Sequence, residues 1–462
     1  MRLTAQEMAV ATDGVWRGGM PEDITAIQTD SRMFQTDALE LGERQSGQLF
    51  LALRGEYFDG HRFAEKLSTQ ASALLGDQQG ADSWQDLPLP QLVVKDTERA
   101  LGDLAHAWRE KLLHTTFIGI TGSYGKTTVR SMLSHLLAAL GFKVHATYAN
   151  LNNLIGVPMT LLSTPEDADI ALIECGISEK GEMQRLAEIL TPDWVVMTGV
   201  TAAHGEGLGG LQGIVQEKAR LLHGLKTDGW CVLGEGVASC FQHYGQMINH
   251  ESIETDVLWG LDGRQLHFSY HGETAWLQLS LPAQHWGANM ALVLSLALKY
   301  AAQQGREIAF ADMVAALATW QPVSGRLQQM QGVGGSLVLD DSYNANPVSM
   351  QAAIRTLQAM PGRRIAILGD MLELGEDSQR LHASLDLAQI ELVLLLGPTM
   401  KYLHQQWPAS CWFEKIEALL LWINDHAHDF HANDTILIKA SHSMQLERVV
   451  RMLTEESEEH AV

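Results

Sequence analysis

The sequence has few cysteines, and their placement argues against two common kinds of site. The four cysteines of this 462-residue chain stand far apart and without Cys-x-x-Cys spacing, at Cys175, Cys231, Cys240 and Cys411. This pattern indicates neither a zinc site nor a disulfide framework. It is typical of a protein in a reducing compartment, and we therefore expect a cytoplasmic location.

Long apolar runs and basic tracts are also missing. No apolar run approaches the roughly 20 residues of a membrane helix, and no apolar core follows the N-terminal charge as in a signal peptide. The chain carries 32 Lys and Arg against 55 Asp and Glu, a formal net charge of −23. The sequence therefore predicts neither membrane insertion nor general nucleic-acid binding, and nothing in it demands more than a monomer.

A glycine-rich segment carries the strongest chemical signal. Residues 119–128 read Gly-Ile-Thr-Gly-Ser-Tyr-Gly-Lys-Thr-Thr, and the β-branched run at 115–118 before them predicts a buried strand. A helix is predicted after them, with Gly141 as its C-terminal cap, because apolar residues recur at three- and four-residue steps: Val129, Met132, Leu133, Leu136, Leu137 and Leu140. Strand, glycine-rich turn and helix form the setting of a phosphate-binding loop.

The residue types in this segment suit a nucleoside triphosphate. Lys126 would reach the outer phosphates, and the Thr127 hydroxyl would hold Mg²⁺. The general pattern has glycine five positions before Gly125, where this chain has Ile120. The alternative is a turn that is glycine-rich for packing alone, but Gly-Lys-Thr-Thr at the helix start favours nucleotide binding.

Polar residues follow the next two predicted strands. Glu174 ends the strand predicted at 169–176, where it could be a Mg²⁺ ligand or a helix-capping or edge carboxylate. His204 follows the strand predicted at 193–199. Lys218 lies in a predicted helix, and taken alone it is interpreted as a solvated surface residue.

The length suggests about three domains, at roughly 150 residues each. Residues 1–113 predict a small α/β unit, and 114–322 a central domain around the phosphate loop. In residues 323–462, strands at 337–341, 364–370, 391–397 and 435–440 alternate with helices, which predicts a parallel, Rossmann-like module. It lacks Gly-x-Gly-x-x-Gly, so a dinucleotide cofactor is not supported.

These motifs together resemble the Mur ligases over nearly the whole chain. The resemblance rests on the loop above and on segments before and after it: 30–32, 47–56, 58–61, 150–153, 155–158, 174–176, 325–327, 340–347 and 368–375. The pattern in the first region and the string Asp-Asp-Ser-Tyr-Asn-Ala-Asn-Pro at 340–347 are specific to members that join D-alanyl-D-alanine to UDP-N-acetylmuramoyl-tripeptide. The resemblance thus implies an ATP- and Mg²⁺-dependent ligase that forms an acyl phosphate, with these two substrates.

The resemblance also implies roles for individual residues. The phosphate-binding residues would be Gly122, Ser123, Gly125, Lys126, Thr127 and Thr128. The magnesium ligands would be Thr127, Glu174, His204 and Lys218, and the last matches a lysine that is carbamylated in most of these ligases. The residues that contact adenine or close over ATP would be Asn289, Arg326, Asp341 and Asn344.

Substrate contacts are implied at both ends of the chain. Ser31 and Arg32 would lie in the UDP-sugar pocket, and the residues on the side of the incoming dipeptide would be Asn346, Lys439, Ser441 and Ser443. Lys126, His204 and Lys218 would take part in catalysis. His204 is better interpreted as a metal ligand than as a general base, and no general base can be named.

Four positions depart from the family pattern: Gly199 replaces an asparagine, Trp286 stands where His-Asn is usual, Arg220 replaces a glutamate and His442 replaces an arginine. They leave open a paralogue that uses another amine, or an inactive nucleotide-binding scaffold. A P-loop kinase or GTPase-like switch is a third alternative, although the chain has no evident guanine-reading Asn-Lys-x-Asp.

Overall fold

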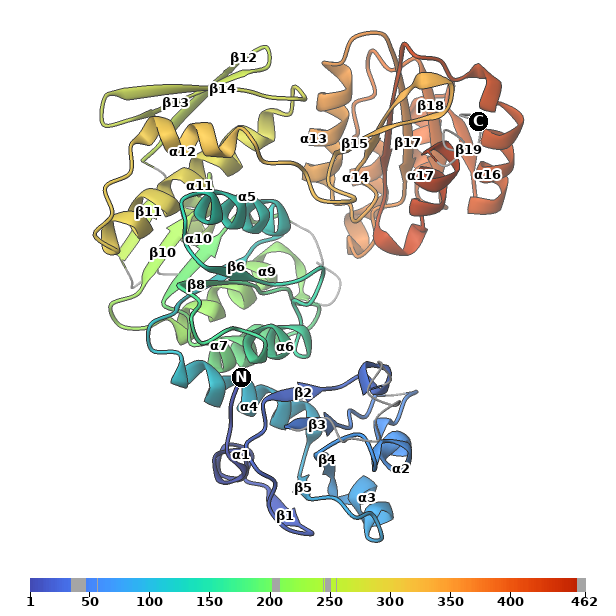
Figure 1. Cartoon of the computed structure of the whole chain (residues 1–462). Helices are drawn as coiled ribbons and strands as arrows, with labels where there is room; N and C mark the ends of the chain where they lie inside the picture. Colours follow the sequence, from blue (N-terminus) through green and yellow to red (C-terminus); the bar gives the residue numbers. More distant parts are fainter. Residues whose placement is uncertain are drawn as a thin grey trace, which may run out of the picture.

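The computed structural model describes residues 1–34, 47–55, 57–201, 208–243, 245, 251–254 and 256–454. The chain is an α/β protein, with four sheets arranged along it (Figure 1). The N-terminal and C-terminal parts lie at opposite ends, with the central part between them (Figure 1). No helix in the described ranges has both the length and the apolar character needed to cross a membrane.

The N-terminal sheet has five strands, of which only β1 runs antiparallel to its neighbour. Its order is β1 (Val15–Arg17), β5 (Gln91–Val94), β4 (Ala73–Asp77), β3 (Gln48–Leu51) and β2 (Ala26–Gln28). The helices of this region are α1 (Ala5–Thr12), α2 (Ala64–Leu67), α3 (Gln78–Ala81) and α4 (Thr97–Lys111). The apolar face of α4 is buried as its spacing predicts, and it joins this region to the central part in one hydrophobic core.

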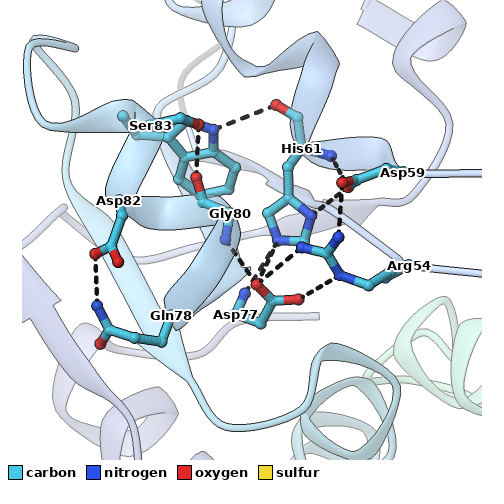
Figure 2. A network of polar contacts seen from close by, with 9 residues as sticks. Arg54, Asp59, His61, Asp77, Gln78, Gly80, Asp82 and Ser83 are labelled. Carbon is cyan, nitrogen blue, oxygen red and sulfur yellow. Dashed lines mark hydrogen bonds and ion pairs between the residues drawn. The ribbon is translucent and has the colours of Figure 1, made fainter.

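Arg54, Asp59 and His61, which lie in segments of the resemblance, form a polar network with the end of β4 (Figure 2). The His61 ring lies between two aspartates: its Nδ1 is 2.6 Å from Asp59 Oδ1, and its Nε2 accepts the Asp77 backbone N–H at 3.0 Å. Arg54 donates to both carboxylates, at 2.8 Å and 2.9 Å. Because Nε2 accepts a hydrogen bond, the ring proton is on Nδ1. The network thus holds Arg54, Asp59 and His61 in place through hydrogen bonds of their own side chains.

The central sheet has six parallel strands. Its order is β11 (Glu251–Glu254), β10 (Trp230–Leu233), β9 (Trp194–Met197), β6 (Thr116–Thr121), β8 (Ile170–Glu174) and β7 (Val144–Ala146). Its helices are α5 (Lys126–Ala139), α6 (Gly156–Leu162), α7 (Glu182–Leu190), α9 (Gly210–Ala219), α10 (Val237–His243), α11 (Gln284–Gln303) and α12 (Phe310–Leu317). Gly141 has a φ of +83° just after α5, which confirms it as the cap.

A small antiparallel sheet is inserted between β11 and α11, formed by β12 (Leu258–Asp262), β13 (Gln265–Tyr270) and β14 (Glu273–Gln278). The C-terminal sheet is parallel except for β15 (Gln328–Gln331). Its strand order starts with β15 and continues with β16 (Leu337–Asp340), β20 (Asp434–Lys439), β17 (Arg363–Gly369), β18 (Leu392–Leu396) and β19 (Cys411–Phe413). Its helices are α13 (Pro347–Gln358), α14 (Ser378–Ala383), α15 (Met400–Gln406), α16 (Ile416–Asp425) and α17 (Glu447–Thr454).

Candidate functional site

A pocket of about 780 Å³ lies between the central and C-terminal parts. Both parts line it, so it exists only where they meet. From the central part come the loop before α5 and the first turn of α11, and from the C-terminal part come the turns before β15 and α13 and the end of β20. Among the lining residues are Ser123, Lys126, Thr127, Thr128, His285, Asn289, Arg326, Asp341, Asn344, Asn346 and Lys439.

The loop from β6 to α5 has the conformation of a phosphate cradle. Gly125 stands at the start of α5 with a φ of +79°, which favours glycine. The Lys126 ammonium donates to the loop's own carbonyl, Gly122 O, at 2.9 Å. Burial lowers the pKa of Lys126, and the nearby Glu174 carboxylate opposes that shift. An anionic ligand at the start of α5 would therefore meet a lysine that is already placed beside it.

Glu174 ends β8, pairs in register with Ile120 of β6, and is only 2% exposed. Its carboxylate accepts hydrogen bonds from Thr127 Oγ1 at 3.1 and 3.2 Å and from Asn152 Nδ2 at 3.0 Å. Arg130 Nε donates to it at 3.3 Å. The carboxylate and hydroxyl assigned to magnesium from the sequence thus touch each other.

Lys218 is not a solvated surface residue, and that interpretation was wrong. Its side chain is buried, and its Nζ donates to Gly122 O at 3.1 Å, the same carbonyl that accepts from Lys126. Burial, and then the charge of Lys126, place the pKa of Lys218 well below its ordinary value. The Glu217 carboxylate opposes this shift only in part, because it also accepts from the Gly181 N–H at 2.7 Å and pairs with Arg220 at 3.4 Å.

The C-terminal side of the pocket is held by a buried ion pair. Lys439 Nζ lies 2.6 Å from Asp341 Oδ2 and donates to Asn344 O at 2.9 Å. Asn346 Nδ2 donates across the pocket to Ser123 O at 3.3 Å, which links the C-terminal part to the phosphate loop.

Arg326 lies beside this ion pair with an unused donor. Its guanidinium lies 4.2 Å from the centre of the Tyr343 ring, and its buried Nε has no hydrogen-bond partner among the described residues. A buried donor without a partner is costly, so this position suits a bound anion.

The first turn of α11 forms another wall of the pocket. Asn289 lines it together with His285, whose pKa burial and the positive Lys439 lower to about 4. His285 is therefore neutral near pH 7. The Trp286 side chain is buried and packs perpendicular to Trp320, with ring centres 5.3 Å apart. Trp286, which departs from the family pattern, therefore has most of its indole ring in the core.

Some sequence-assigned residues are not brought to this pocket. Arg32, in the turn with Ser31, pairs with its own neighbour Asp30 at 2.6 Å and is 83% exposed. Ser441 is buried and accepts the Leu372 N–H at 2.9 Å, so its hydroxyl positions a backbone turn. The substrate roles of these residues stay predictions.

Two further assignments are affected in different ways. His204 lies outside the described residues, and its proposed roles in catalysis and metal binding stay predictions. The His442 ring lies 5.7 Å from the Tyr343 ring and is tilted against it by 35°, and Tyr343 also contacts the Arg326 guanidinium.

Three residues near the site were not assigned from the sequence. Arg130 could have been found, because it lies one helical turn after Lys126 and Thr127 and therefore on the same face of α5. His285 and Asn152 gave no comparable signal, because their roles depend on Lys439 and Glu174, which are distant in sequence.

The departure at Gly199 has a local cause in Tyr124 of the phosphate loop. A Cβ at position 199 would lie 2.6 Å from Tyr124 Oη and Cε2, so the ring occupies the space of a side chain there. The Gly199 carbonyl in turn accepts the Ser123 N–H at 2.7 Å. Tyr124 and Gly199 therefore form a size-matched pair that supports the loop.

We expect Gly199→Asn to destabilise the protein by about 1–3 kcal/mol through overpacking against Tyr124. The measurement is the midpoint of urea unfolding. Adding Tyr124→Ser should recover most of the loss, because it removes the obstructing ring. A double variant as unstable as Gly199→Asn alone would contradict the pairing.

Comparison with known proteins gives the family. Residues 120–297 match the Mur ligase middle domain, and residues 325–442 match the Mur ligase glutamate ligase domain. The chain is 33% identical to UDP-N-acetylmuramoyl-tripeptide–D-alanyl-D-alanine ligase of Escherichia coli, with 98% of each chain covered. It is 31% identical to the Bacillus subtilis enzyme of the same name, covering 90% of this chain and 93% of that one.

Solved structures agree with these matches. MurF of Acinetobacter baumannii superposes with a TM-score of 0.83 at 28% identity, covering 97% of this chain and 98% of that one. MurF ligase of Thermotoga maritima, solved in complex with ADP, superposes with a TM-score of 0.76 at 26% identity, with coverages of 92% and 97%. The phosphate loop, the pocket and these matches lead to one conclusion: the chain belongs to the Mur ligase family.

Proposed function

We propose that this protein is an ATP-dependent ligase that joins D-alanyl-D-alanine to UDP-N-acetylmuramoyl-tripeptide, a step of peptidoglycan precursor synthesis. The observation that carries the proposal is the pocket that the phosphate loop and the C-terminal part line together. Support comes from relatives with this printed activity that match over almost the whole chain. The shared pocket suits a nucleotide on the central side and an incoming amine on the other.

Amide formation explains why the site needs a triphosphate. A free carboxylate has no good leaving group, so one of its oxygens would attack the γ-phosphorus of ATP and release ADP. The amine nitrogen would then attack the acyl carbon, and phosphate would leave with that oxygen while the amine loses a proton. Lys126 lies where it would offset the growing negative charge. Closure of the two parts over the pocket would exclude water from the acyl phosphate.

The residues present fit a magnesium ion. No group of three or more His, Cys, Asp or Glu that could hold a metal occurs in the described ranges. Mg²⁺ in nucleotide sites, however, is usually held by one or two carboxylates together with phosphates and waters. Thr127 and Glu174 would supply a hydroxyl and a carboxylate, and His204 stays a predicted further ligand. The ion would neutralise phosphate oxygens and orient the γ-phosphate.

Lys218 would reach the metal only as a carbamate, and its environment favours one. A neutral amine attacks CO₂ and loses one proton, and burial favours the neutral amine here. We expect enzyme in ¹³C-bicarbonate to give a carbamate carbon signal in NMR spectra. Lys218→Ala should lack that signal, whereas Lys226→Ala, which changes an exposed lysine of the same region, should keep it. The same spectrum from both variants would contradict modification at Lys218.

The remaining predictions complete the proposal. The domains would be 1–113 for the UDP-sugar, with Ser31 and Arg32, then 114–322 for ATP and 323–462 for the dipeptide. Asn346, Lys439 and Ser441 would serve the dipeptide side, although Lys439 and Ser441 act there through the turns that they hold. The protein would be a cytoplasmic monomer.

One assay tests this function against its alternatives. Phosphate release from ATP should require UDP-N-acetylmuramoyl-tripeptide and D-alanyl-D-alanine together. Release with neither would indicate a hydrolytic switch, and release with the tripeptide and a different amine only would indicate a paralogue. No release under any condition, with ATP still bound, would indicate an inactive scaffold.

A further inference from the structure

Arg130 is a largely buried cation beside the phosphate loop, and the proposed chemistry described above gives it no role. It lies on α5 one turn after Lys126, and its side chain is 12% exposed. Its Nε donates to Glu174 Oε2 at 3.3 Å. A guanidinium carries five N–H donors, and this contact uses one of them, because no further hydrogen bond of Arg130 is found within the described residues.

The partner of Arg130 is also the carboxylate proposed for magnesium. Glu174 already accepts from Thr127 and Asn152, so a metal ion at its oxygens would compete with Arg130 for the same negative charge. Arg130 would then be a cation in a largely buried place with a shared counter-ion. Such a group favours binding of another anion close by.

The position of Arg130 decides which anion that is. Lys126, Thr127 and Thr128 line the pocket between the two parts, whereas Arg130 does not. It therefore lies beside the nucleotide pocket, on the side of Glu174. In the proposed reaction the acceptor carboxylate must approach the γ-phosphate held at Lys126, and a guanidinium fork matches a carboxylate with two parallel hydrogen bonds.

We propose that Arg130 binds the reacting carboxylate of the acceptor substrate through its Nη donors and orients it toward the γ-phosphate. This inference rests on the proposed function, because it names the group that recognises the acid. The alternative is an ion pair with Glu174 that serves stability only. The two differ in what they predict for an acceptor whose reacting carboxylate is replaced by a carboxamide.

The test measures binding by calorimetry, in the presence of Mg²⁺ and a non-hydrolysable ATP analogue. The ligands are UDP-N-acetylmuramoyl-tripeptide and its C-terminal carboxamide, and the proteins are wild type, Arg130→Gln, Arg130→Lys and Arg364→Gln. Arg364 is a matched control because it also forms a close ion pair, with Glu391 at 2.6 Å, but lies in the C-terminal sheet.

We expect wild type and Arg364→Gln to prefer the acid by about 10- to 100-fold, as for a hydrogen bond between charged groups. Arg130→Gln should bind both ligands about equally, and Arg130→Lys should keep part of the preference. An acid-to-amide ratio in Arg130→Gln that equals the wild-type ratio, or no preference in wild type, would overturn the inference.

Binding and turnover separate this inference from the proposed function. Suppose that wild type prefers the acid, that Arg130→Gln loses this preference, and that wild type forms no amide with D-alanyl-D-alanine. The proposed function would then be wrong, and the inference that Arg130 binds a carboxylate would still hold. If wild type forms the amide while Arg130→Gln keeps the full preference for the acid, the proposed function stands and the inference fails.

Discussion

Lys126→Ala is expected to lower kcat by about 10²- to 10³-fold, the loss seen when one preorganised donor to a developing charge is removed. The lysine lines the pocket at the start of α5 and donates to Gly122 O, so its Nζ is in position before a nucleotide arrives. Stability should change little, since burial already disfavours the charged form of this side chain. The measurements are initial rates of phosphate release and the midpoint of urea unfolding.

The control for this variant is Lys143→Ala. Lys143 is 65% exposed and pairs with Asp167 on the surface at 2.8 Å, so its removal should leave the rate unchanged. A Lys126→Ala protein that folds normally and keeps its rate within a few-fold would show that the loop is not the phosphate site.

Lys439→Met is expected to cost about 3–5 kcal/mol of stability, the usual penalty for removing one partner of a buried ion pair. Lys439 is 1% exposed and Asp341 is 7% exposed, so the remaining carboxylate would lose its ion-pair partner and meet little water. The free energy of unfolding, from urea titration followed by tryptophan fluorescence, measures the loss. The double variant Lys439→Met with Asp341→Asn should lose less, because it removes both charges of the pair.

The pH dependence of this variant follows from the same geometry. Burial already raises the pKa of Asp341, while the charge of Lys439 opposes that rise. Without the lysine the pKa should rise further, and the protonated acid is cheaper to bury than the carboxylate. The loss of unfolding free energy in Lys439→Met should therefore be largest at neutral pH, and it should shrink as the pH falls toward the raised pKa of Asp341. A loss of unfolding free energy that grows as the pH falls would contradict the assignment of this pH dependence to Asp341.

Much of the site's framework could be predicted because its signals are local. A β-branched run, three glycines and a helical stripe follow one another in 115–140, and they specify β6, the loop and α5. The place of Glu174 at the end of a buried strand follows from the rule that ligands gather at carboxyl ends of parallel strands. These features depend on residues close in sequence.

The rest depends on residues that only the fold brings together. The sequence does not distinguish Lys218 from other helix lysines, because its partner, the Gly122 carbonyl, is distant in sequence. The Lys439–Asp341 pair likewise joins the end of β20 to the residue just after β16. Strand β15 reads Gln-Gln-Met-Gln, without the alternation that reveals a half-buried strand. Strand β19 has three residues, too few to show a period.

The central claim is that ATP activates a carboxylate by phosphorylating it. The most direct measurement uses UDP-N-acetylmuramoyl-tripeptide with ¹⁸O in its reacting carboxylate, followed by mass spectrometry of the released phosphate. The proposed mechanism predicts one ¹⁸O atom in each phosphate, because the carboxylate oxygen that attacks the γ-phosphorus leaves with it. Amide product accompanied by phosphate without ¹⁸O would contradict the mechanism.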